Sequence, residues 1–151
     1  TMGDNEKKKV LFICVHNSAR SQIAEVYLRE FGDDLFEVES AGLEPGRLNP
    51  YVVEVLKEDG IDITDKKTKS AWELFRAGKR YDYVITVCSR EAEEKCPVWP
   101  QPTERRSWSY PDPSKFTGTE EEITVKVREL RNIMKEQVKQ FIESYRNNER
   151  G

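Results

Sequence analysis

The chain has 151 residues, a length that suits one compact domain with a single hydrophobic core. Its formal net charge of -3 gives no reason to expect nucleic acid or an anionic membrane as a partner. No apolar run approaches the roughly 20 residues that cross a bilayer, and the polar start lacks the pattern of a signal peptide. We therefore expect a cytoplasmic protein.

One domain is expected over residues 8–146, because no repeat, long linker or shift of composition divides the chain. Thr1 precedes Met2, so we expect residues 1–7 to be a disordered segment or a remnant of cloning. Residues 147–151 are expected to form a C-terminal tail.

Apolar periodicity predicts strands that alternate with helices. The predicted strands cover 9–15, 36–39, 83–87 and 106–110, and the predicted helices cover 21–31, 50–59, 71–77, 89–95 (one or two turns) and 119–145. Asn49 before Pro50 matches a helix N-cap, and Thr119 with Glu122 matches a capping box. The alternation predicts a single-domain, three-layer α/β fold with a mainly parallel four-stranded sheet and helices on both faces.

The strongest candidate site is the loop that joins the first strand to the first helix. Cys14 ends the strand, and Arg20 follows six positions later. Such a loop can direct its N–H groups at an anion, and the start of the helix adds its positive dipole end. The same features stabilise a thiolate that attacks the bound anion. The expected oxyanion-binding residues are Val15, His16, Asn17, Ser18, Ala19, Arg20 and Ser21.

Two further cysteines, Cys88 and Cys96, follow the third predicted strand. A zinc site would want four ligands, and His16 is the only histidine, which speaks against a metal. Independent structural thiols are one interpretation, since buried free cysteine is common. The other interpretation is that Cys88 and Cys96 form a redox pair. Cys88 lies at the carboxyl end of a strand, as Cys14 does, so both face one edge of the sheet.

The stretch "CVHNSARSQIAE" resembles the catalytic loop of the low-molecular-weight phosphotyrosine phosphatase fold, and within it the thioredoxin-coupled arsenate reductases. Similar stretches follow in the same order, namely "SAGLEPGRLNP" (40–50), "VITVCSREAEEKCP" (84–97) and "WSYPDPS" (108–114). Gln22 matches the reductases, whereas the phosphatases usually have proline there. Ser114 stands where the phosphatases usually have an aromatic residue.

The resemblance implies an arsenate reductase in which Cys14 attacks arsenate, for which phosphate or sulfate would be mimics. Asp112 would protonate the leaving oxygen. Near a thiolate and a bound oxyanion we expect its pKa to be raised, so that it can hold its proton. Cys88 would then form a disulfide with Cys14. Cys96 would next attack Cys88 and form a Cys88–Cys96 disulfide nearer the surface. Residues 89–95 would have to rearrange for this exchange, and a thioredoxin-like protein would reduce the product.

No cofactor is expected. Some relatives bind potassium through residues that resemble Asn17, Glu25 and Ser40 plus an aspartate, but the aspartate position falls near Ser70 here. His16 replaces a glycine that is frequent in the loop, and its role stays open. Two alternatives to the reductase also stay open: a phosphatase for aryl phosphate monoesters that uses Cys14, Arg20 and Asp112, and a non-catalytic oxyanion-binding module.

Overall fold

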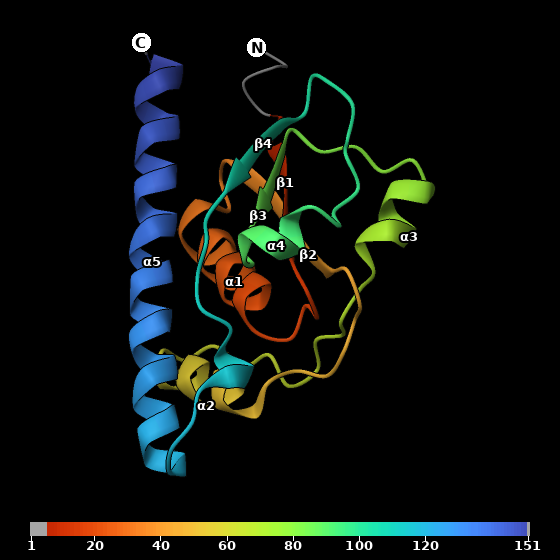
Figure 1. Ribbon diagram of the computed structural model, residues 1–151. Coiled ribbons are helices and arrows are strands. Elements are labelled where there is room, and N and C mark those ends of the chain that lie inside the picture. The colour runs from red at the N-terminus through yellow and green to blue at the C-terminus, as the bar shows by residue number, and fades with distance from the viewer. Residues whose placement is uncertain (1–5, 151) are drawn as a thin grey trace.

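Four parallel strands form one sheet in the order β2-β1-β3-β4 in the computed structural model, which describes residues 6–150 (Figure 1). The strands are β1 (Lys8–Cys14), β2 (Phe36–Gly42), β3 (Tyr83–Thr86) and β4 (Glu104–Ser107). The helices are α1 (Arg20–Gly32), α2 (Pro50–Glu58), α3 (Ala71–Arg76), α4 (Arg90–Glu93) and α5 (Glu120–Arg150). Because all strands are parallel, their carboxyl ends meet at one edge, where the loop after Cys14 begins.

Apolar side chains cover both faces of the sheet. In β1, Val10, Phe12 and Cys14 belong to a major core with α1, α2 and α5, whereas Leu11 and Ile13 belong to a minor core with α3. Figure 1 shows α5 along one side of the molecule and α3 on the opposite side of the sheet. The predicted three-layer α/β fold is therefore confirmed, with the larger helical layer on the face that carries the Cys14 side chain.

The local signals at the helix ends work as the sequence predicts. Asn49 accepts hydrogen bonds from the amides of Tyr51 and Val52 and caps α2, which has Pro50 as its first residue. Thr119 and Glu122 exchange two hydrogen bonds of 3.1 Å before α5, which is a capping box. No helix among the described residues is long and apolar enough to span a membrane.

Two boundaries differ from the predictions. The fourth strand covers Glu104–Ser107 instead of 106–110, because a polar edge strand pairs with β3 and carries no apolar alternation to reveal it. The last helix continues past Tyr145 to Arg150, through most of the predicted tail. Within the predicted N-terminal segment 1–7, residues 1–5 lie outside the described residues.

Candidate active site

The loop after Cys14 is held from outside through its carbonyl groups. Four of them accept hydrogen bonds of 2.7–3.1 Å from the chain that follows β2. The pairs are the Cys14 carbonyl with the Leu43 amide, Val15 with Glu44, His16 with Gly46, and Ser18 with Asn49. A fifth carbonyl, that of Asn17, accepts from the side chain of Gln22 at 3.0 Å. Since C=O and the next N–H point in opposite directions across a trans peptide, the amides of residues 15–19 face the other way, toward the interior of the loop.

The start of α1 closes the same cradle. Its N-cap residue, Ala19, makes no side-chain capping bond, so the first amides of the helix are available to an anion. The loop thus collects consecutive N–H groups and a helix N-terminus around one point, which is the geometry that binds a tetrahedral oxyanion.

Gly42 lets β2 approach the loop closely. A Cβ atom on Gly42 would lie 2.7 Å from the backbone N of Asn17 and 2.8 Å from the carbonyl oxygen of Val15. Asn17 has a φ of 55°, in the left-handed region that asparagine tolerates better than most residues. The loop shape therefore depends on a glycine beside it and an asparagine within it.

A buried chain of hydrogen bonds ends on the Cys14 sulfur. The Asn17 side-chain amide donates to Ser21 Oγ at 2.7 Å and to Ser40 Oγ at 2.9 Å. Ser21 Oγ lies 2.9 Å from Cys14 Sγ. Because Ser21 Oγ already accepts from Asn17, its own hydrogen is free to point at the sulfur, and that bond stabilises a thiolate.

The other end of this chain is a buried carboxylate. Ser40 Oγ donates to Glu25 Oε1 at 2.5 Å, and Glu25 Oε2 accepts from Lys66 Nζ at 2.6 Å and pairs with Arg29 at 2.7 Å. Two cations of the chain itself therefore balance the charge of Glu25. Lys66 is not among the predicted site residues, because it lies in a polar stretch and its partner is apparent only in the fold.

Arg20 directs its guanidinium to the same edge of the sheet. The side chain is buried, and it donates to the Tyr110 carbonyl at 3.1 Å. Its Nη2 lies 3.8 Å from Asp112 Oδ2. The structure thus brings Arg20 and Asp112 together, although 92 positions separate them in the sequence.

The pKa of Asp112 is set by its neighbours in the chain, and the rise expected beside a bound oxyanion stays a prediction. Burial raises this pKa. Hydrogen bonds from the amide and hydroxyl of Ser114, together with the charges of Arg20 and Lys115, lower it by more than burial raises it. The net pKa is below the ordinary value. Both Ser114 bonds fall on Oδ1, so Oδ2 remains to face Arg20 and the loop.

Cys88 follows β3 and is buried in the major core with Cys14. Burial raises the pKa of the Cys88 thiol to about 11, and the charge of Cys14 contributes to the rise. Ile13 pairs with Thr86, and the amide of Val87 donates to the Ile13 carbonyl, so Cys88 comes just past the point where β1 and β3 lie side by side. Neighbouring parallel strands are about 4.8 Å apart, which keeps the two cysteines in one neighbourhood.

Cys96 is buried as a free thiol, and the disulfide expected nearer the surface stays a prediction. It is 6% exposed and belongs to the minor core with Ile13 and Trp99. Burial raises the pKa of Cys96 to about 12, and the charge of Cys88 adds to this. All three thiols are free in the structure.

The side chain of His16 turns away from the loop interior. It is exposed, and its Nδ1 donates to the Glu44 carbonyl at 2.9 Å. The part of His16 available to an anion in the loop is thus its backbone amide, as it is for Val15, Ser18 and Ala19. A hollow of about 210 Å³ lies beside this part of the loop and α4, and it is lined by Val15, Leu43, Glu44, Trp72, Ala92 and Lys95.

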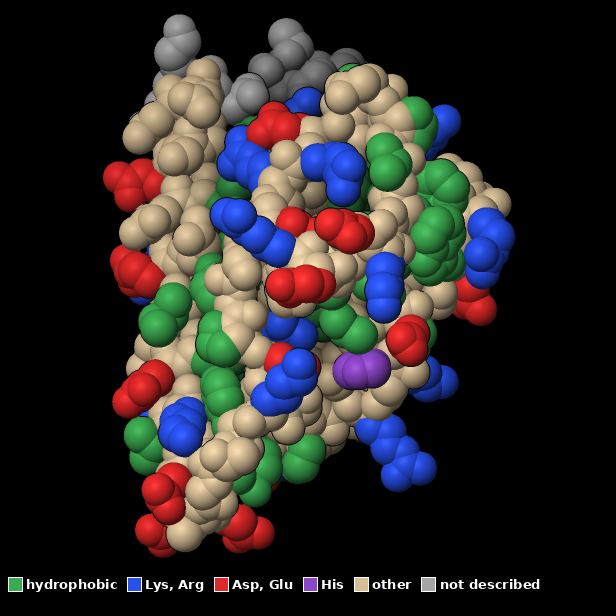
Figure 2. Space-filling view, in the orientation of Figure 1, with side chains coloured by type: hydrophobic (Ala, Val, Ile, Leu, Met, Phe, Trp, Pro, Cys, Tyr) green, Lys and Arg blue, Asp and Glu red, His purple; other side chains and the backbone are tan. Residues whose placement is uncertain are grey.

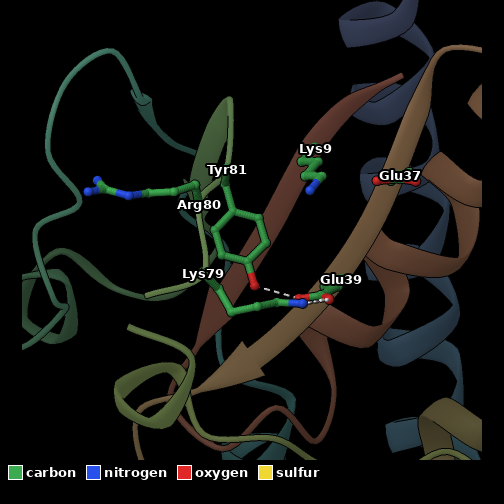
Figure 3. A pocket seen from close by; sticks show the side chains of 6 residues that line it. All are labelled: Lys9, Glu37, Glu39, Lys79, Arg80 and Tyr81. Atoms are coloured by element: carbon green, nitrogen blue, oxygen red, sulfur yellow. Dashed lines mark hydrogen bonds and ion pairs between the residues drawn. The ribbon is translucent and has the colours of Figure 1, made fainter. Parts of the chain in front are cut away.

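A second hollow, of about 110 Å³, lies at the other end of the strands (Figure 3). Three of its side chains pair with one another, because Tyr81 donates to Glu39 Oε2 at 2.5 Å and Lys79 lies 3.3 Å from Glu39 Oε1. Lys9, which also lines it, is near the start of β1, whereas Cys14 ends that strand. This hollow is therefore separate from the oxyanion loop.

Comparisons with known proteins agree with this geometry. The profile of the low molecular weight phosphotyrosine protein phosphatase family matches residues 9–150. The chain is 38% identical to an arsenate reductase of Bacillus licheniformis over 140 residues, which cover 91% of this chain and 97% of the relative. A solved structure described as an arsenate reductase in the intermediate state is 32% identical, with a TM-score of 0.71 over 91% of this chain and 98% of the other. A thioredoxin-dependent arsenate reductase of Corynebacterium glutamicum is 30% identical, with a TM-score of 0.59 over 92% of this chain and 65% of that one.

Proposed function

Since the chain belongs to the low-molecular-weight phosphotyrosine protein phosphatase family, we propose that its phosphatase-like loop serves arsenate reduction. The observation that carries this proposal is the presence of two further thiols, Cys88 and Cys96, beside an oxyanion loop that already holds a nucleophilic cysteine. Phosphate ester hydrolysis needs no such thiols, whereas reduction of arsenate needs two electrons from the protein.

The first step is attack of the Cys14 sulfur on arsenic. Arsenate sits among the N–H groups of residues 15–20, with the Arg20 guanidinium on its oxygens. Ser21 Oγ lies 2.9 Å from the sulfur, and a sulfur–arsenic bond forms from the thiolate while one oxygen leaves as water. The hydrogen bonds that hold the loop and the contact of Ser21 with Cys14 are present without substrate, so little reorganisation is needed.

Asp112 is our candidate for the proton donor to the leaving oxygen. Its low pKa in the free protein depends partly on the charge of Arg20. A bound oxyanion competes for that guanidinium and repels the carboxylate, and both effects raise the pKa of Asp112. We therefore propose that Asp112 takes up a proton when arsenate binds and passes it to the oxygen that leaves.

Cys88 then attacks the Cys14 sulfur. A Cys14–Cys88 disulfide forms, the sulfur–arsenic bond breaks, and its electron pair stays on arsenic, which departs as arsenite. The two thiols are oxidised by two electrons and arsenic is reduced by two. Once Cys14 is bound to arsenic, its negative charge no longer raises the pKa of Cys88, which favours the attacking thiolate at this moment.

In the last internal step Cys96 attacks Cys88, the Cys14–Cys88 bond breaks, and Cys14 leaves as the thiolate ready for another substrate. A thioredoxin-like dithiol then reduces Cys88–Cys96, as the name of the Corynebacterium glutamicum relative suggests for that protein. A cytoplasmic location remains a prediction from the sequence.

The test is arsenite production by the full chain with thioredoxin, thioredoxin reductase and NADPH. We expect turnover in the wild type, none in Cys14→Ser or Cys88→Ser, and loss of thioredoxin-driven turnover in Cys96→Ser. Hydrolysis of p-nitrophenyl phosphate is measured on the same samples. A chain that hydrolyses the ester equally well in wild type and Cys88→Ser, and makes no arsenite, would be a phosphatase instead.

A further inference from the structure

The segment between Cys88 and Cys96 has one polar attachment to the sheet. Its hydrogen bonds run mostly within itself, from the amide of Glu93 to Ser89, from Lys95 to Ala92, and from Cys96 to Glu93. In the described part of the chain, the hydrogen bonds that join residues 89–95 to the sheet end on the carboxylate of Glu93.

Glu93 bridges two strands. Its Oε1 accepts from Thr86 Oγ1 at 2.5 Å, at the end of β3, and from Ser107 Oγ, at the end of β4. Hydrogen bonds to an ionised carboxylate are roughly twice as strong as neutral ones. Those bonds also lower the pKa of Glu93, so the carboxylate is charged at neutral pH.

The other contacts of this segment are weak. Helix α4 has only four residues and buries none of them completely. Ala92 packs against the major core, but it also lines the 210 Å³ hollow with Val15 and Trp72. Space therefore lies beside α4 on the side of the loop, and little apolar area opposes its displacement. Figure 2 shows acidic and basic side chains interleaved on the face that carries α4, which leaves this segment well solvated.

Movement of this segment is required if the relay proceeds as proposed. Cys88 belongs to the major core and Cys96 to the minor core, which lie on opposite faces of the sheet. Disulfide geometry demands Cα atoms about 5.5–6 Å apart with matching Cβ directions. The α4 turn stands between the two thiols in the chain, so we infer that it opens when their sulfurs bond.

We propose that Glu93 is a positioning residue that holds residues 89–95 on the ends of β3 and β4, and that release of its carboxylate from Thr86 and Ser107 limits the transfer of the disulfide from Cys14–Cys88 to Cys88–Cys96. This inference rests on the proposed function for its chemistry, but the attachment itself exists in the reduced chain without substrate. We call the set Glu93, Thr86 and Ser107 the Glu93 latch.

The first experiment follows labelling of Cys96 by N-ethylmaleimide in the reduced full chain, without arsenate, by peptide mass spectrometry. Opening of the Glu93 latch exposes Cys96, so we expect Glu93→Ala to label about tenfold faster than wild type. Thr86→Val removes one donor and leaves the carboxylate of Glu93. We expect Cys96 in this variant to be labelled faster than in wild type, but by a smaller factor than in Glu93→Ala. Glu91→Gln is the matched control, because Glu91 is an exposed carboxylate of α4 and should label at the wild-type rate.

A second experiment measures the transfer itself. Reduced protein receives one equivalent of arsenate without reductant, is quenched with alkylating reagent, and the two disulfides are quantified over time. In Glu93→Ala we expect the conversion of Cys14–Cys88 to Cys88–Cys96 to be about tenfold faster, with arsenite release changed less than twofold. A purely structural role would slow both steps or leave their ratio unchanged.

The outcomes separate the two proposals. Equal Cys96 labelling in Glu93→Ala, Thr86→Val and wild type, with unchanged circular dichroism, would overturn the Glu93 latch whether or not arsenate is reduced. Faster labelling in both variants, together with no arsenite from wild type, would support the Glu93 latch and overturn the proposed function. Faster labelling with an unchanged transfer rate would show that opening does not limit the exchange, and would overturn the inference.

Discussion

The two halves of the site are built in opposite ways. The oxyanion loop, residues 14–21, has carbonyls bound to the chain after β2, an asparagine at φ 55° and a buried hydrogen-bond chain from Lys66 to Cys14. The relay segment, residues 88–96, is a single short helix joined to the sheet by one carboxylate. Binding and attack need donors fixed in advance, whereas passing a disulfide between faces of the sheet needs a part that moves.

This contrast explains where each cysteine lies. Cys14 sits at the end of a central strand, where two neighbours in the sheet fix its position. Cys88 and Cys96 are buried as protonated thiols with raised pKa values of about 11 and 12, and are thereby protected from stray oxidation until the segment opens. Cys14 thus differs from Cys88 and Cys96 in its surroundings, although all three thiols are buried.

The largest expected effect comes from distorting the fixed half. Gly42→Ala would place a Cβ 2.7 Å from Asn17 N, and since the neighbour is backbone, the loop must shift. A displacement of that kind costs about 100-fold in rate, so we expect kcat/KM for arsenate to fall by roughly that factor. Gly46→Ala is the matched control, because its Cβ would meet His16 Cβ at 3.4 Å.

Labelling of Cys96 should stay at the wild-type rate in Gly42→Ala. If the relay segment also became exposed, the two halves would not be independent and the comparison between them would fail. Near-normal activity in Gly42→Ala would mean that the close approach of β2 does not shape the loop.

A smaller effect on kcat/KM is expected from the end of the buried hydrogen-bond chain that lies farthest from Cys14. Lys66→Met removes the 2.6 Å partner of Glu25 and leaves Arg29 to balance the carboxylate. The bonds through Ser40 and Asn17 to Ser21 should weaken, and we expect kcat/KM to fall about fivefold. Lys67→Met, at the exposed neighbouring position, serves as control. Equal activity in both variants would show that the hydrogen bonds beyond Asn17, toward Lys66, do not affect catalysis.

The smallest expected effect is electrostatic and links the halves. The charge of Cys14 contributes to the raised pKa of Cys88, so removing it should lower that pKa from about 11. Ultraviolet titration of thiolate would compare Cys96→Ser with the double variant Cys14→Ser/Cys96→Ser. The high-pH transition should move to lower pH in the double variant, because the thiolate of Cys88 then forms without a like charge nearby. An unmoved transition would place the two sulfurs too far apart to interact.

Much of the fixed half could be predicted from the sequence. The buried strand, the polar loop and the helix start are local signals, and they led to Cys14, Arg20 and the loop amides. Gly42 could have been recognised, since glycine at the end of a strand commonly marks a close backbone approach. Lys66 and Tyr110 could not, because each contributes through a contact with a residue far away in the chain.

The movable half was harder to predict for a physical reason. Charged residues from Arg90 to Lys95 indicated a solvated turn, and the sequence contains nothing to show that only Glu93 among them binds the sheet. Trp108 and Tyr110 indicated a strand, but the paired residues are the polar Glu104–Ser107, which explains why Ser107 was not recognised as a partner of Glu93. The Ser114 bonds that lower the pKa of Asp112 could not be predicted, because they depend on the local turn.

The most direct test of the whole account is the state of the three thiols after one turnover. Reduced wild-type protein would receive excess arsenate without any external reductant, and alkylated peptides and arsenite would be quantified at the end point. We predict one arsenite for each chain, a Cys88–Cys96 disulfide and a free Cys14. Arsenite release that leaves a Cys14–Cys88 disulfide and a free Cys96 thiol would contradict the movable relay. Three free thiols with unchanged arsenate would contradict arsenate reduction.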